Sequence, residues 1–234
     1  MTISSLPAQR PAGRLDPCRA GRLIALEGGE GSGKSTQAAL LASRLSAMLT
    51  REPGGCELGE RIRSIVLEAP GRKIAGRAEA LLFLAARAQH VAEVIQPALA
   101  AGRWVVVDRF AGSTLAYQGY GAGLDLAQLA RVSEWAVDGV APDLTVLIDI
   151  SLELLGSRAA GRGGPLDRFE SEDRDFHDRV LEGYREMARA DPEHWVVVDG
   201  AGPIEEVAAV ILALVVERIG VAPGGELPGG EQWP

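Results

Sequence analysis

Short apolar runs alternate along the chain with longer segments in which apolar residues recur at helical spacing. The runs predict buried strands at 23–26, 48–50, 103–108, 144–150 and 195–199. The longer segments predict helices at 36–41, 59–68, 77–100, 124–136, 152–160 and 176–189, and a last helix after Pro203. Pro97 is expected to kink or end the helix that contains it. Continuously apolar strands separated by helices indicate a three-layer α/β fold, with a parallel five-stranded sheet covered by helices on both faces.

The first apolar run leads into the glycine-rich sequence GGEGSGKS at 28–35. It matches the phosphate-loop pattern G-x-x-x-x-G-K-[ST] and stands between a predicted strand and a predicted helix, which is the context that the pattern requires. A glycine-rich turn with no ligand is the alternative. In a phosphate loop, backbone N–H groups and the helix N-terminus hold phosphate, the lysine reaches the β- and γ-phosphates, and the hydroxyl binds Mg²⁺. The phosphate-binding residues predicted here are Gly28, Gly29, Glu30, Gly31, Ser32, Gly33, Lys34, Ser35 and Thr36, with Ser35 as the metal ligand.

Charged residues stand where two further predicted strands end. Ligands of open α/β sheets bind at the carboxyl ends of the strands, and Arg51, Asp108 and Arg109 are expected there beside the phosphate loop. The guanidinium fork suits phosphate oxygens, although a surface salt bridge is the other interpretation of each arginine. Asp108 either positions Mg²⁺ through water or orients Arg109, and both alternatives stay open.

Composition narrows the class of protein. A length of 234 residues fits one domain, and a net charge of −8 argues against broad nucleic-acid affinity. No apolar run is long enough to cross a bilayer, and the first residues lack the apolar core of a secretory signal. We expect flexible tails at 1–21 and 221–234 around a domain at 22–220. Cys18 and Cys56 are expected to be free thiols, consistent with a cytoplasmic protein.

Two features separate this chain from other phosphate-loop proteins. It contains no asparagine, so it lacks the Asn-Lys-x-Asp motif with which GTPases read guanine. The glycine-rich segment SRAAGRGGPLDR at 157–168 carries Arg158, Arg162 and Arg168 and predicts a lid at about 157–169. A solvated basic loop is the alternative. A chain of this size with a lid indicates a small kinase.

The motifs resemble those of the thymidylate kinase (dTMP kinase) family, in the family's order, from about residue 22 to about residue 220. Besides the phosphate loop, they are REPGG at 51–55, LLF at 81–83, RAQH at 87–90, DRF at 108–110, ST at 113–114, YQG at 117–119, PDL at 142–144 and LDRFE at 166–170. The resemblance implies the nucleoside monophosphate kinase fold and transfer of the γ-phosphoryl group of ATP to dTMP, giving ADP and dTDP for dTTP synthesis. It also implies Mg²⁺ and a homodimer. A kinase for another nucleoside monophosphate and a catalytically silent nucleotide-binding protein are the alternatives.

The resemblance also implies how the base is read. In the family, the aromatic residue matching Phe83 stacks on thymine and the arginine matching Arg87 donates to thymine O4. The two residues are four positions apart, and therefore share one helix face. Because arginine only donates hydrogen bonds, it suits O4 of thymine and disfavours the N4 amino group of cytosine. Without the resemblance, Phe83 would be interpreted as an ordinary core residue.

The remaining substrate contacts follow from the same resemblance. Arg51 and Arg109 match arginines that hold the acceptor phosphate, Glu30 matches an acidic residue that accepts from the sugar 3′-hydroxyl, and Tyr117 matches the residue beneath the deoxyribose. Ser113 and Gln118 complete the predicted dTMP site.

The lid assigns the chain to one branch of the family. Gly31 stands where the other branch carries a catalytic arginine, so the lid is expected to supply one, as in the bacterial-type arrangement. The predicted catalytic residues are therefore Lys34, Asp108, Arg109, Arg158, Arg162 and Arg168. The stretch 36–51 is shorter than is usual in the family, which puts the placement of Arg51 in question.

Overall fold

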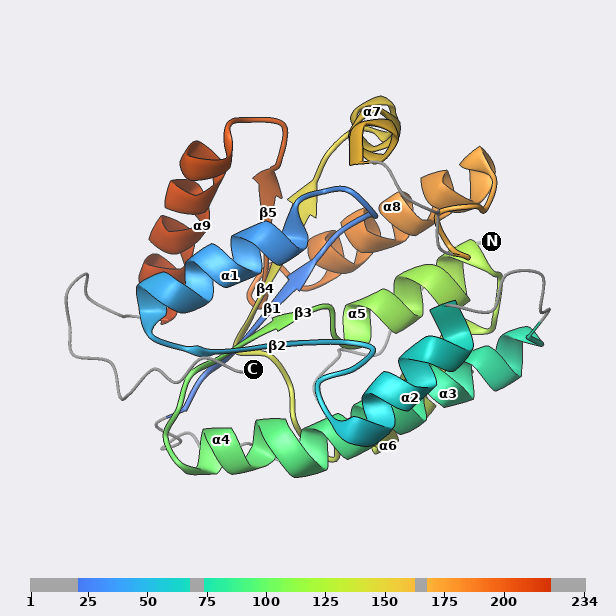
Figure 1. The fold of residues 1–234 in the computed structure, drawn as a ribbon, viewed down its shortest axis with the longest axis horizontal. Helices are drawn as coiled ribbons and strands as arrows, with labels where there is room; N and C mark the ends of the chain where they lie inside the picture. The colour runs from blue at the N-terminus through green and yellow to red at the C-terminus, as the bar shows by residue number, and fades with distance from the viewer. Residues whose placement is uncertain (1–20, 68–73, 163–167, 220–234) are drawn as a thin grey trace.

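The computed structural model describes residues 21–67, 74–162 and 168–219. The expected tails at 1–21 and 221–234 lie outside these residues except for Gly21, as does part of the expected lid. The strands are β1 (Leu23–Glu27), β2 (Met48–Arg51), β3 (Val105–Asp108), β4 (Leu144–Asp149) and β5 (Trp195–Asp199). The helices are α1 (Lys34–Leu45), α2 (Glu57–Leu67), α3 (Gly76–His90), α4 (Gln96–Ala100), α5 (Ala111–Thr114), α6 (Leu126–Val137), α7 (Leu152–Arg162), α8 (Arg174–Ala190) and α9 (Ile204–Ile219), with π-helical segments η1 (Val91–Ile95) and η2 (Leu115–Gly121) (Figure 1).

The five strands form one parallel sheet in the order β2-β3-β1-β4-β5. The central strand β1 pairs with β3 on one side and with β4 on the other, so the strand order reverses there. In α/β sheets, ligands bind at the carboxyl end of such a switch point. The phosphate loop follows β1 directly and therefore lies at this position.

Successive side chains of β1 point to opposite faces of the sheet and pack into two different hydrophobic cores. Ile24 and Leu26 pack with α1 and α9 on one face of the sheet, and Leu23 and Ala25 pack with η1 and α4 on the other. Figure 1 shows α1 and α9 on one side of the sheet and α4 on the opposite side. The period-two alternation of a strand sends apolar residues to both faces, so each face needs a helical layer. The predicted three-layer fold is confirmed.

The predicted helix at 77–100 forms as one helical run made of α3, η1 and α4. The run does not end at Pro97, which lies in the first turn of α4, directly after the π-helical segment. Proline lacks the N–H that an α-helix interior would use, and a change of hydrogen-bonding pattern before it accommodates that loss. The next strand begins at Val105, later than predicted, because Arg103 instead donates its N–H to Ala98 at the helix end.

Although the connection after α1 is short, Arg51 lies at the carboxyl edge of the sheet. Ser46 ends the helix in a left-handed conformation, with φ of 49°, and β2 starts two residues later. Arg51 lies opposite Asp108 in the β2–β3 register. The position of Arg51 that the sequence left in question is therefore beside Asp108.

Candidate active site

The phosphate loop is shaped by glycines with positive φ. Gly28 has φ of 145°, and a Cβ there would lie 2.5 Å from the carbonyl oxygen of Ile148 in β4, so only glycine fits. Gly33, with φ of 91°, precedes α1, and a Cβ added to it would meet no atom within 4 Å. The loop is thus packed against the sheet at one end and has open space at the helix N-terminus, where an anion is favoured.

The Lys34 side chain is buried inside the phosphate loop. Its Nζ donates to the carbonyl oxygen of Gly29 at 2.7 Å, and only 5% of the residue is exposed. Burial, helped by the nearby Arg109 charge, lowers the pKa of Lys34 to about 8, although the Glu30 carboxylate counteracts part of this shift. A phosphate at the loop would supply the negative charge that restores the ammonium form.

Ser35 and Asp108 form a site that suits Mg²⁺. The Ser35 hydroxyl lies 2.5 Å from Asp108 Oδ2, and Asp108 Oδ1 is buried with no hydrogen-bond partner among the described residues. Mg²⁺ binds one or two protein oxygens and completes its shell with water and substrate phosphates. In keeping with this sparse donor set, the described residues contain no group of three or more His, Cys, Asp or Glu side chains able to hold a metal.

One pocket lies beside the phosphate loop at the carboxyl edge of the sheet. Lys34, Ser35 and Asp108 line its phosphate-loop side. All of the residues predicted to bind dTMP line it as well: Glu30, Arg51, Phe83, Arg87, Arg109, Ser113, Tyr117 and Gln118. They come from the phosphate loop, β2, α3, the turn after β3, α5 and η2, and the fold brings them together.

Arg109 occupies the centre of a polar network. Its φ is 69°, which is uncommon for a residue with a Cβ, and such strain is concentrated at functional sites. Its guanidinium donates to Glu30 at 2.5 Å and to the Tyr117 hydroxyl at 3.1 Å, and lies 4.9 Å from the Tyr117 ring centroid. Burial opposes the charge, but Glu30 outweighs it and the pKa of Arg109 is above its ordinary value. The guanidinium is therefore permanently charged at the pocket.

Glu27 supports the site, although it was not among the residues predicted from the sequence motifs. It ends β1 with no exposed surface, and its carboxylate accepts from the backbone N–H groups of Phe110 and Ser113 and from the hydroxyls of Ser113 and Tyr184. Burial raises the pKa of Glu27, although these hydrogen bonds lower it in part. The carboxylate fixes the turn that carries Arg109. The signal in the sequence was an acidic residue at the end of an apolar strand.

The aromatic rings of Phe83, Tyr117 and Phe169 form one wall of the pocket. Phe83 lies 5.9 Å from Phe169 between ring centroids, and Tyr117 meets Phe169 edge-on at 5.5 Å. Phe169 lies just beyond the undescribed part of the lid segment and was not among the predicted site residues. A flat, apolar space next to hydrogen-bonding groups is the usual environment for a bound base.

Arg87 is buried and held by three acceptors. Its Nε donates to Glu52 at 2.6 Å, and its terminal nitrogens donate to Thr114 Oγ1 at 2.8 Å and to the carbonyl oxygen of Phe110 at 2.9 Å. Glu52 and Thr114, which sequence reasoning did not single out, also line the pocket. Charged residues are rarely buried unless they are paired. The apolar residues around Arg87 in the sequence were therefore the available signal that this arginine is buried with partners.

The lid arginines are not equivalent. Arg158 in α7 donates to the carbonyl oxygens of Ser32, at 3.4 Å, and Gly200, at 2.9 Å, and so contacts the phosphate loop. Arg168 instead pairs with Glu79 of α3, and its guanidinium lies over the Phe169 ring. Arg162 belongs to α7, but its side chain lies outside the described part of the structure.

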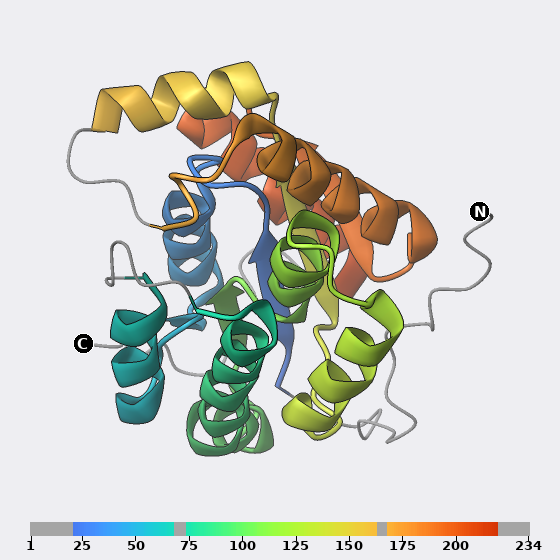
Figure 2. The same ribbon diagram turned by 90° about the vertical axis from the view of Figure 1, so that its right-hand side faces the viewer.

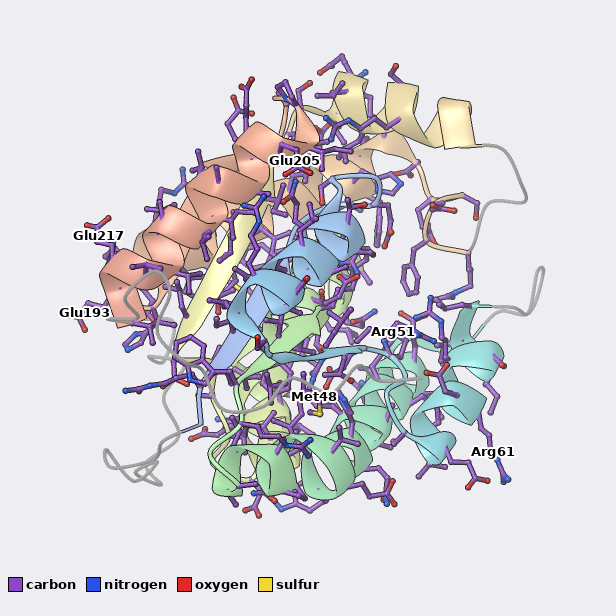
Figure 3. All side chains as sticks on the ribbon, turned by 60° about the vertical axis from the view of Figure 1, so that its left-hand side comes forward. Met48, Arg51, Arg61, Glu193, Glu205 and Glu217 are labelled. Carbon is purple, nitrogen blue, oxygen red and sulfur yellow. The ribbon has the colours of Figure 1, made fainter. Side chains whose placement is uncertain are left out.

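Arg51 pairs with both carboxylate oxygens of Glu60 in α2, each at 3.0 Å. Figure 3 shows Arg51 at the end of β2 beside α2, whereas Arg61 points outward from the same helix. About half of the Arg51 side chain is exposed, and it lines the pocket. An anion in the pocket would compete with Glu60 for this guanidinium.

Comparisons with known proteins agree on one family. The family model described as thymidylate kinase matches residues 26–211. A thymidylate kinase of Magnetococcus marinus is 45% identical over 207 residues, covering 86% of this chain and 99% of the relative, and one of Clavibacter michiganensis is 49% identical over 196 residues, covering 82% and 92%. The crystal structure of thymidylate kinase from Ehrlichia chaffeensis superposes with a TM-score of 0.70 at 32% identity, covering 83% of this chain and 98% of that chain.

The family model spans most of the chain, and the relatives align over nearly their whole length. The chain therefore belongs to the thymidylate kinase family.

Proposed function

We propose that this protein transfers the γ-phosphoryl group of ATP to dTMP, with ATP on the phosphate loop and dTMP in the pocket beside it. The observation that carries the proposal is the convergence of the phosphate-loop residues and all predicted dTMP contacts on one pocket. Membership of the thymidylate kinase family supports the same reaction.

The roles along the acceptor follow from its chemistry. Arg51 and Arg109 bind the monophosphate, whose second pKa of about 6 leaves it largely a dianion at neutral pH. The acceptor is therefore already nucleophilic and needs no general base. Phe83 stacks on the base, Arg87 donates to its O4, Glu30 accepts from the sugar hydroxyl, and Tyr117 lies beneath the sugar.

On the ATP side of the site, catalysis depends on positive charge and on the alignment of the phosphates. Lys34 and the backbone N–H groups of the loop hold the ATP phosphates, and a lid arginine adds positive charge where it develops during transfer. Ser35, with Asp108 near it, would hold Mg²⁺, which would neutralise negative charge on the ATP phosphates. Asp108 serves both the metal and, through its position beside Arg51 and Arg109, the acceptor end.

A substrate panel tests this function. Coupled ADP-release assays with dTMP, dUMP, dCMP and AMP should give the highest kcat/KM for dTMP. Arg87→Ala should raise the KM for dTMP by about tenfold or more, as expected for a lost hydrogen bond to a charged group, and change the KM for ATP little. A preference for dCMP in the unmodified protein would refute the assignment of Arg87, and no activity with any monophosphate would favour a silent nucleotide-binding protein.

We also propose that the protein is a homodimer through the outer surface of α3 and α6. This surface exposes Trp135 at 82%, Leu81 at 58% and Val132 at 37%. Figure 2 shows α2, α3 and α6 side by side, and α3 is in contact with both α2 and α6. Large apolar patches on a folded protein mark interaction sites. A second copy is the occupant that the family resemblance favours.

A cytoplasmic location is the remaining proposal. A reducing compartment suits free thiols, and it also suits nucleotide synthesis from ATP. Cys56 is a buried free thiol, and burial raises its pKa. In the described part of the chain, no helix combines the length and apolar character needed to cross a membrane.

A further inference from the structure

Three buried polar side chains behind Arg87 have no part in the chemistry described above. Thr50 lies in β2 with 5% exposure, Glu52 follows that strand with 6%, and His90 in the last turn of α3 has none. Buried polar groups are costly unless they are paired, so their arrangement requires an explanation.

The three side chains form a hydrogen-bonded chain that ends on Arg87. One oxygen of Glu52 accepts from Arg87 Nε at 2.6 Å, and the other lies 3.0 Å from His90 Nδ1. His90 Nε2 lies 2.7 Å from Thr50 Oγ1. Because the ionised carboxylate only accepts hydrogen bonds, His90 Nδ1 carries a proton and donates it to Glu52. Burial would raise the pKa of Glu52, but Arg87 and His90 outweigh it and the pKa of Glu52 lies below its ordinary value.

This chain of contacts leaves little freedom to Arg87. Arg87 and His90 are three positions apart on one helix face, so both reach the same carboxylate. A Cβ on Gly55 would lie 2.4 Å from His90 Nε2, which shows that the backbone of the segment 51–55 packs directly against the histidine. The carboxylate is therefore confined from both sides.

Arginine has five N–H donors. Glu52, Thr114 and the Phe110 carbonyl accept three of them, leaving one N–H on each terminal nitrogen of Arg87 without an acceptor in the described part of the chain. Arg87 is only 3% exposed and lines the pocket. The two remaining donors are therefore available to a ligand there.

We propose that Glu52 and His90 are positioning residues for base selection: His90 holds the Glu52 carboxylate, which fixes the Arg87 guanidinium with its two unused donors available to the base. The inference rests on the proposed role of Arg87 in reading thymine. A guanidinium held by Nε cannot turn away from a base that offers an amino group in place of a carbonyl. The arrangement therefore enforces discrimination against cytosine as well as affinity for thymine.

Paired substitutions of His90 test this role. His90→Leu removes both ring nitrogens, whereas His90→Asn retains an N–H donor near the position of Nδ1. We expect His90→Leu to raise the KM for dTMP by about tenfold, to lower the ratio of kcat/KM for dTMP over dCMP, and to leave the KM for ATP within about twofold. His90→Asn should retain most of the dTMP affinity and selectivity. His194→Leu, remote from the pocket, is the matched control, and Glu52→Gln should resemble His90→Leu.

A double-substitution cycle then separates positioning from packing. If His90 acts through Arg87, the variant Arg87→Ala/His90→Leu should have the same dTMP KM as Arg87→Ala alone. Multiplicative effects, or a loss of kcat with unchanged selectivity and unchanged KM values, would overturn the proposal. Thermal melting of each variant identifies those that have lost the fold, and the comparison of His90→Asn with His90→Leu remains decisive if Glu52→Gln does not fold.

The cycle also distinguishes this inference from the function on which it rests. If Arg87→Ala leaves dTMP selectivity unchanged, the thymine-reading role itself is wrong and the positioning role fails with it. If Arg87→Ala abolishes selectivity and His90→Leu does not, only the positioning role is wrong.

Discussion

The Ser35 hydroxyl lies 2.5 Å from the Asp108 carboxylate, although 73 positions separate the two residues in the chain. Ser35 is in the first turn of α1, and Asp108 is the last residue of β3, which pairs with the central strand beside the phosphate loop. Parallel pairing of β1 and β3 brings both strand ends to one edge. The contact joins the predicted metal ligand to a carboxylate whose second oxygen is buried and has no hydrogen-bond partner in the described part of the chain.

Removing this carboxylate charge should weaken the use of Mg²⁺. We expect Asp108→Asn to raise the Mg²⁺ concentration required for half-maximal activity and to lower kcat by about 10²-fold, because the hydroxyl of Ser35 alone offers a neutral ligand. Initial rates over a Mg²⁺ titration measure the change. Asp138→Asn, at an exposed helix end remote from the pocket, is the control. An unchanged Mg²⁺ requirement in Asp108→Asn would show that Asp108 only orients the neighbouring arginines.

Lys34 should be indispensable for turnover. Its ammonium group is positioned by the loop carbonyl of Gly29, and removing it takes away a charge aimed at the transferring phosphate. We expect Lys34→Ala to lower kcat by about 10²–10³-fold while the far-ultraviolet circular dichroism spectrum stays the same. ADP release in a coupled assay gives the rate. Activity near that of the unmodified protein would refute the phosphate-loop assignment.

ATP binding should weaken as the pH rises through about 8. Burial lowers the pKa of Lys34 to about 8 in the ligand-free protein, so Lys34 is charged below this pH and neutral above it. Bound phosphate favours the charged form, so above pH 8 binding must take up a proton and the affinity should fall by up to about tenfold per pH unit. Calorimetric titration with ATP in buffers of different ionisation enthalpy measures this uptake. Lys34→Arg, whose guanidinium stays charged, should show no such fall.

The lid arginines should differ in their effect on catalysis. Arg158 contacts the phosphate loop, whereas Arg168 pairs with Glu79, which also accepts from Gln118 at the base end of the pocket. We expect Arg158→Ala to lower kcat by roughly 10³-fold and Arg168→Ala to act mainly on the KM for dTMP. Steady-state kinetics with each substrate varied in turn distinguishes the two effects. Arg189→Ala, which removes an exposed ion pair with Glu182 within α8, is the control. The reverse pattern would assign the catalytic charge to Arg168.

A charge at the most exposed tryptophan should break the proposed dimer. Trp135→Glu places a carboxylate in the apolar surface of α3 and α6, where a second copy would have to desolvate it. Sedimentation velocity should report a dimer for the unmodified protein and a monomer for this variant. Val197→Glu makes a similar change on β5, where Val197 is 54% exposed, and should remain dimeric. A monomeric unmodified protein would refute the proposal.

Much of the fold could be predicted because its signals are local. The apolar runs at 23–26 and 195–199 are strands, since parallel strands packed under helices have few polar positions. The boundaries were less secure: the run at 103–108 begins its strand only at Val105, because a helix-end hydrogen bond competes for Arg103. Such competition depends on which segments lie next to each other in the folded chain. The hydrophobic pattern of the sequence does not predict these neighbours.

The sequence by itself determined the phosphate loop and the residue types that suit a nucleotide, because a loop of consecutive residues and a helix face repeat the same local geometry wherever they occur. Only the tertiary structure decided the strand order, and with it the meeting of Glu52 with Arg87 and His90, 35 and 38 positions away. It likewise decided that Arg168 faces Glu79 and Arg158 the phosphate loop. These pairings arise when separate strands and helices bury their apolar faces together, and that packing depends on the whole chain.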